Sequence, residues 1–82
     1  MGIDEYTGEI HDLDVTLWVG KAGVESASEE LATQLKHREL VKVRVLRAGR
    51  GGRGIEEIAE ELASSVDGRV IDVRGHTTVI GR

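Results

Sequence analysis

The 82-residue sequence contains no cysteine, proline or phenylalanine, and it has one tryptophan and one tyrosine. Without cysteine there are no disulfides and no thiolate metal site, so an apolar core must hold the fold unaided. No apolar run approaches the roughly 18 residues of a membrane-spanning helix, and no export leader is evident. We expect one small cytoplasmic domain with a core of Val, Ile, Leu and Ala, and with Trp18 and Tyr6 as its only large aromatics.

The net charge of −4 is distributed unevenly along the chain. Residues 1–34 are strongly acidic and contain Lys21 as their single lysine or arginine, and residues 55–82 are again acidic. Residues 35–54 are strongly basic and contain Glu39 as their single acid. Because salt screens charges beyond roughly 10 Å at 0.1 M, a local basic patch can attract a polyanion to an acidic protein.

A Gly-x-x-Gly turn that contains a lysine lies between a predicted strand and a predicted helix. The turn is Gly20-Lys21-Ala22-Gly23. Alternating apolar residues before it predict a strand over 12–19. After it, Ser26 and Glu29 have the spacing of a capping box, which predicts a helix over 26–38. Two glycines allow the backbone to approach a ligand, and a nearby helix N-terminus favours an anion.

The predicted helix has an apolar stripe and a polar face. The stripe consists of Ala27, Leu31, Ala32 and Leu35. Gln34 is expected to face water, and His37 and Arg38 are expected in the last turn, where positive charge complements the helix dipole. Trp18, on the strand before the turn, is either a core residue or a base-stacking residue on the face opposite Leu17.

The second half of the chain predicts a strand, a loop, a helix and a hairpin. Residues 40–46 alternate as a strand, with Lys42 and Arg44 on the face opposite its valines. Residues 48–54 are too glycine-rich for regular structure and are expected to be mobile. Residues 55–66 follow as a helix that Gly68 ends in a left-handed conformation. Strands over 70–73 and 77–80 are joined by a tight turn at 74–76.

These elements predict an α/β protein of the two-layer α+β type, with the order β-α-β-α-β-β and a mixed four-stranded sheet. Residues 1–11 form a partly ordered lead-in, in which Tyr6 or Ile10 packs on the core, and residues 12–82 form a single domain. Strand-helix-strand units are parallel, so the turns at 20–23, 47–54 and 74–76 should emerge at one sheet edge, where ligands of open sheets gather.

This edge is expected to gather cations around glycine-rich backbone, a combination suited to the phosphates of a nucleic acid. The predicted binding residues are Gly20, Lys21, Ala22, Gly23, Lys42, Arg44, Arg47, Arg50, Arg53, Arg74 and His76. The alternative for each arginine is a solvated loop residue, and for Lys42 and Arg44 an ordinary charged sheet face.

Three stretches resemble the CRM domain, whose single-domain form is the YhbY family. They are Trp18-Val19-Gly20-Lys21-Ala22-Gly23, Leu40-Val41-Lys42-Val43-Arg44-Val45 and Val73-Arg74-Gly75-His76-Thr77. The resemblance covers about residues 13–82 and implies a fold similar to the C-terminal domain of bacterial translation initiation factor three. It also implies RNA binding, with the turn at 20–23 acting like the Gly-x-x-Gly loop of KH domains. Bacterial members are associated with large-subunit ribosome precursors, and plant relatives with intron splicing.

An enzyme is disfavoured because His11, His37 and His76 fall in separate elements without triad-like or metal-like spacing. We expect no cofactor and no metal. An Alba-like chromatin protein is an alternative, although its long basic hairpin contrasts with the short turn here. A second alternative is a protein-interaction module of the ribosome. The expected partner is ribosomal or pre-ribosomal RNA, without a membrane, and the expected state is a monomer.

Overall fold

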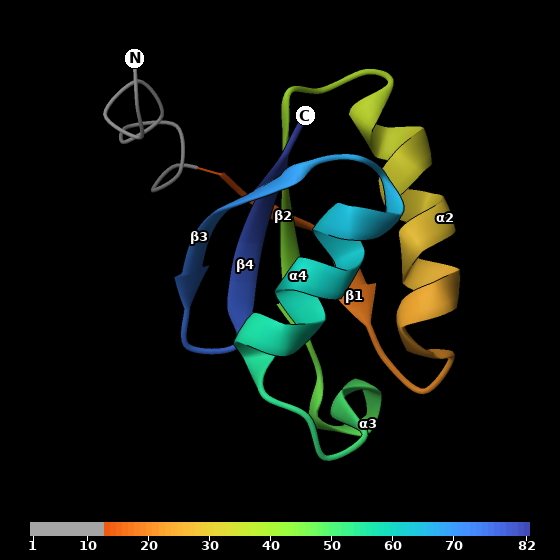
Figure 1. Ribbon diagram of the computed structural model, residues 1–82, viewed down its shortest axis with the longest axis vertical. Coiled ribbons are helices and arrows are strands. Elements are labelled where there is room, and N and C mark those ends of the chain that lie inside the picture. The colour runs from red at the N-terminus through yellow and green to blue at the C-terminus, as the bar shows by residue number, and fades with distance from the viewer. Residues whose placement is uncertain (1–12) are drawn as a thin grey trace.

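The computed structural model describes residues 13–82, which form one mixed sheet with helices packed on one face (Figure 1). The elements are β1 (Val15–Val19), α2 (Gly23–Leu35), β2 (Leu40–Val45), α3 (Arg47–Arg50), α4 (Ile55–Ser65), β3 (Arg69–Arg74) and β4 (Thr77–Gly81). The strand order is β1-β2-β4-β3; β1 and β2 are parallel, and β4 is antiparallel to both β2 and β3. This confirms the predicted α+β fold and its mixed four-stranded sheet.

The core is aliphatic and lies between the sheet and the helices α2 and α4. Its fully buried members include Val19, Leu31, Val43 and Leu62. The expectation of Trp18 as a core aromatic is wrong, because this side chain is 54% exposed. Strand alternation explains the difference, since Leu17 and Val19 turn toward the helices and Trp18 therefore turns away from them.

Helix α2 begins at Gly23, earlier than the predicted start. The predicted capping box is wrong, because Ser26 and Glu29 both lie inside the helix and Ala22 is the N-cap, without a side-chain cap hydrogen bond. The N–H of Gly23 instead donates to the carbonyl oxygen of Gly20 at 2.9 Å. The Gly-x-x-Gly turn therefore leads directly into the first turn of the helix.

The buried stripe of α2 differs from the prediction at two positions. It consists of Val24, Ala27, Leu31 and Leu35. Ala32 is exposed, and Gln34, expected in water, is half-buried. The amide nitrogen of Gln34 donates to the carbonyl oxygen of Thr16 at 2.8 Å, and its amide oxygen accepts from the Thr16 hydroxyl at 2.6 Å. This contact occurs where the β1–β2 register shifts, between Val15 and Leu17.

Helix α2 ends at Leu35, so His37 and Arg38 lie after the helix and not in its last turn as predicted. The start predicted for the first strand, Asp12, lies outside the described residues. So do the lead-in at 1–11, Tyr6 and Ile10. None of the helices in the described range has the length and apolarity needed to cross a bilayer.

Helix α4 and the hairpin after it occupy the predicted segments. The left-handed residue after α4 is Asp67, with φ of 55°, and not Gly68 as predicted. Gly68 is required for a different reason, because a Cβ there would lie 2.4 Å from the carbonyl oxygen of Gly81. The hairpin turns on Gly75 and His76, and Gly75 has the positive φ of 58° that such a tight turn needs.

Candidate nucleic-acid interface

Three connections meet at the C-terminal ends of the parallel strands. They are the β1–α2 turn, the β2–α4 connection with α3, and the β3–β4 turn, all at the same end of the molecule in Figure 1. The N–H of Leu46 donates to the carbonyl oxygen of Val19 at 2.9 Å, which ties the second connection to β1. The N–H of Val45 donates to the carbonyl oxygen of His76 at 2.8 Å, which ties it to the hairpin.

The segment predicted to be an irregular, mobile loop contains the one-turn helix α3. Gly49 is buried in this helix, and a Cβ built on it would lie 2.4 Å from the carbonyl oxygen of Val19. Here glycine allows close packing of α3 on the end of β1, and this contact was not visible in the composition of the loop. Gly51 then ends α3 in the left-handed conformation, with φ of 59°.

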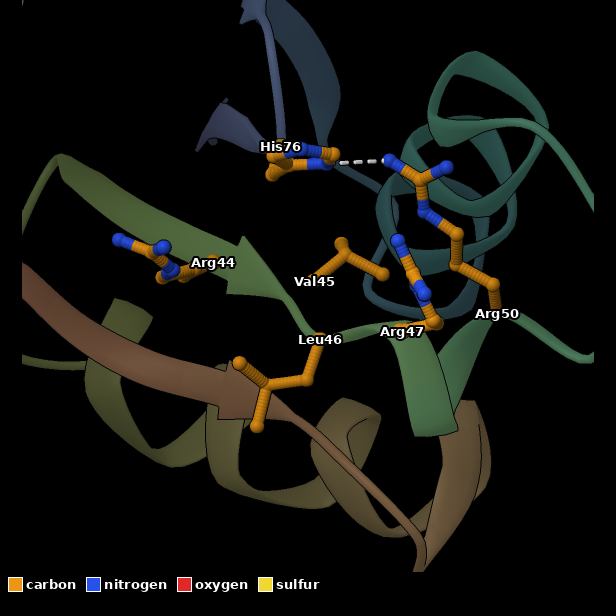
Figure 2. Close-up of a pocket in the computed structure, with 6 residues that line it drawn as sticks. All are labelled: Arg44, Val45, Leu46, Arg47, Arg50 and His76. Atoms are coloured by element: carbon orange, nitrogen blue, oxygen red, sulfur yellow. Dashed lines mark hydrogen bonds between the residues drawn. The ribbon is translucent and has the colours of Figure 1, made fainter.

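Helix α3 and its neighbours enclose a pocket of about 240 Å³. Its lining residues are Arg44, Val45, Leu46, Arg47, Arg50 and His76. Figure 2 shows Arg47 and Arg50 on one side of Val45 and Arg44 on the other, with His76 above Val45. The Nη2 of Arg50 donates to Nδ1 of His76 at 2.5 Å, a contact between segments far apart in the chain.

The electrostatics of this pocket favour an anion. It is lined by three arginines and no acid, so its guanidinium groups have no counter-charge among the lining residues. The Nε of Arg50 is buried without a hydrogen-bond partner. A buried donor without an acceptor costs about 1–3 kcal/mol, so packing holds the Arg50 side chain in place at that cost. Charge-assisted hydrogen bonds from the arginines to a phosphate would supply the counter-charge that the lining residues lack. Arginine also binds phosphate through two parallel N–H donors.

The Gly-x-x-Gly turn lies beside this pocket. A Cβ on Gly20 would lie 3.7 Å from Cδ1 of Leu46, which lines the pocket. Lys21 and Ala22 are exposed in the turn. Gly23 has φ of 88°, a positive value that glycine adopts readily and other residues rarely do. The turn therefore presents a lysine and the first amides of α2 at the end of the sheet that carries the arginines.

The predicted binding residues Lys42, Arg74 and Arg53 are not among the residues that line the pocket. Lys42 is half-buried on β2, two residues before Arg44 and on the same face of the strand. Arg74 is exposed at the end of β3. Arg53 forms an ion pair with Glu61 of α4, whose carboxylate raises the pKa of Arg53 mainly by accepting its hydrogen bond. Arg53 is thus held by an acid of its own chain, a pairing that the sequence pattern did not predict.

Sequence reasoning missed Leu46 as a neighbour of the site. The strand predicted over 40–46 includes Leu46, but β2 ends at Val45, and Leu46 is 41% exposed between the Gly-x-x-Gly turn and the arginines. The breakdown of the strand alternation at Leu46 and Arg47 is the sequence signal that could have indicated it. In the described part of the chain, no group of three or more His, Cys, Asp or Glu residues could hold a metal ion.

Residues 3–82 match the family described as the CRS1 / YhbY (CRM) domain. The chain belongs to this family. A relative, the "Probable RNA-binding protein MJ0652" of Methanocaldococcus jannaschii, is 42% identical over 72 residues. The match covers 88% of this chain and 54% of the relative, so the chain spans about half the relative's length.

A solved structure is similar to this CRM domain throughout the chain. It is SAV1595 of Staphylococcus aureus, a candidate RNA-binding protein, with a TM-score of 0.76 and 28% identity. The similarity covers 98% of this chain and 82% of the other. The resemblance noted from the sequence motifs is therefore confirmed by both the family match and the fold.

Proposed function

We propose that this CRM-domain protein binds ribosomal or pre-ribosomal RNA through backbone phosphates during ribosome assembly. It acts as a cytoplasmic monomer without catalytic activity, and its Gly-x-x-Gly turn and arginine pocket contact the RNA together. The family match and the RNA-binding names of both relatives support RNA as the ligand.

The observation that carries the proposal is the unsatisfied cationic pocket next to the turn. The hydrogen bond to His76 orients the guanidinium of Arg50, and no acid lines the pocket. Arg47 lines the same pocket from the same helical turn. A phosphate would supply the counter-charge that this arrangement lacks. An Alba-like mode is disfavoured because the hairpin here turns on only Gly75 and His76.

Crosslinking in living cells followed by RNA sequencing tests the ribosomal assignment. We expect the crosslinked fragments to be enriched in ribosomal RNA and its precursors, and the protein to co-sediment with large-subunit particles. Recovery of mainly unrelated transcripts would contradict the role in ribosome assembly. Recovery of no RNA at all would contradict RNA binding itself.

Glu61→Gln is expected to tighten RNA binding about fivefold at 0.1 M salt. The substitution releases Arg53 from its ion pair, and one further phosphate contact contributes about 0.7–0.9 log units at that salt concentration. The salt dependence of the affinity should steepen by the same amount. The matched control is Glu60→Gln, an exposed neighbour with the same change in charge. Equal effects of both variants would show that Arg53 does not reach the RNA.

A further inference from the structure

Trp18 and Arg44 are neighbours on the sheet face that the helices leave uncovered. They are register partners across the parallel strands β1 and β2, so their side chains lie on the same face. Neighbouring strands are only about 4.8 Å apart, which is short relative to either side chain. Arg44 also lines the arginine pocket, so this face and the pocket share a residue.

The exposed large apolar side chains of the described chain gather at this end of the sheet. Trp18 is 54% exposed and Leu46 is 41% exposed, and the other large hydrophobic side chains between residues 13 and 82 are buried or half-buried. Leu46 follows β2 directly, and its N–H is bonded to Val19, the residue after Trp18. An aromatic ring is therefore open to solvent at the border of a cationic pocket.

We infer, on the basis of the proposed RNA-binding function, that this surface takes an unpaired nucleotide, with its base stacked on Trp18 and an adjoining phosphate bound by Arg44. Stacking on an aromatic ring requires a free base face, which an unpaired strand presents and a continuous duplex does not. Because Trp18 and Arg44 are register partners, the indole ring and the guanidinium group can contact the same RNA strand. The ligand is thus single-stranded RNA or an unpaired segment of a folded RNA.

Fluorescence of the protein itself gives the first test, because Trp18 is the single tryptophan of the chain. A short RNA of uridines is expected to quench the emission on binding. Inorganic polyphosphate, which has the charge but no bases, is expected to bind without comparable quenching. An RNA duplex of the same length is expected to bind more weakly than the unpaired strand at equal salt.

Trp18→Leu and Trp18→Phe form the matched pair of variants. Leucine keeps an apolar side chain without a ring, and we expect about tenfold weaker binding of the uridine RNA, within the range of one lost stacking contact. Phenylalanine keeps a ring and should retain most of the affinity. Both variants should bind polyphosphate like the parent protein, and equal thermal melting curves would show that both are folded.

The outcomes separate this inference from the proposed function. If the parent protein binds RNA without quenching and Trp18→Leu binds it equally well, the stacking role is wrong and phosphate-mediated RNA binding stands. If duplex and unpaired RNA bind with equal affinity, the preference for an unpaired strand is wrong. If the parent protein binds polyphosphate but neither RNA, the proposed function fails as well.

Discussion

Gly49→Ala is expected to destabilise the protein by about 2 kcal/mol, which in a domain of this size lowers the melting temperature by about 10 °C. The added Cβ would lie 2.4 Å from the carbonyl oxygen of Val19 and 2.9 Å from its Cγ1. The nearest atom belongs to the backbone of a fully buried residue, and the same oxygen accepts the hydrogen bond from Leu46. Neither side can move without breaking the junction of α3 with β1.

Helix propensity acts in the opposite direction at this position. Replacing glycine by alanine inside a helix normally gains about 0.5–1 kcal/mol. Since α3 has a single turn and Gly49 lies against β1, the steric term is the larger one. We also expect weaker RNA binding, because α3 carries Arg47 and Arg50 into the pocket.

Gly54→Ala is the matched control for this substitution. Gly54 belongs to the same connection, has an ordinary φ of −77°, and has no atom within 4 Å of the position of an added Cβ. Gly54 is the N-cap of α4, where alanine is less favourable than glycine by about 0.5–1 kcal/mol. Alanine also lowers the entropy of the unfolded chain, which offsets a similar amount, so the melting temperature should stay within a few degrees of that of the parent. Equal melting temperatures for Gly49→Ala and Gly54→Ala in thermal denaturation would contradict the close packing of α3 on β1.

The regular elements could be predicted because their apolar periodicity is controlled by the core. The valines of β2 recur at every second residue, and the apolar residues of α4 recur at helical spacing, so that each element buries one face. The misassigned positions are those where a tertiary contact outweighs a local preference. Ser26 has the residue type of a cap, yet α2 starts at the Gly20–Gly23 turn. The glycine-rich composition around Gly49 predicts a mobile loop, whereas in the structure Gly49 allows α3 to pack closely against Val19.

The meeting of the three turns followed from the rule that parallel strands end at one edge. The details of the site did not follow, because they depend on strand order and register. The Arg50–His76 contact needs β4 beside β2, and the Trp18–Arg44 pair needs the register of β1 against β2. Neither can be read from one sequence.

The combined substitution of Arg44, Arg47 and Arg50 by glutamine is expected to weaken RNA binding about 100-fold at 0.1 M salt. The parent protein should show a log–log salt slope of about −3 to −5, corresponding to four to six neutralised phosphates. Three lost contacts remove about 2 units from that slope, and the same amount from the logarithm of the affinity at 0.1 M. Fluorescence anisotropy of a labelled RNA over a series of salt concentrations measures both quantities.

The charge-matched control replaces Lys36, Arg38 and Arg69 by glutamine. These exposed residues follow the C-terminus of α2 or begin β3, at the opposite end of the molecule from the turns. Net charge changes equally in the two variants, so any difference between them reports the location of the charge. Because salt screens interactions beyond roughly 10 Å at 0.1 M, the control should lose only a few-fold in affinity and keep the parent slope.

The slope also separates a lost contact from a lost fold. A partly unfolded variant would bind less RNA at every salt concentration, with the slope of its remaining folded fraction unchanged. A variant that folds but lacks three phosphate contacts has a shallower slope, and its affinity approaches that of the parent near 1 M salt. Equal slopes for the pocket variant and the control would therefore place the RNA elsewhere on the domain, whatever the absolute affinities are.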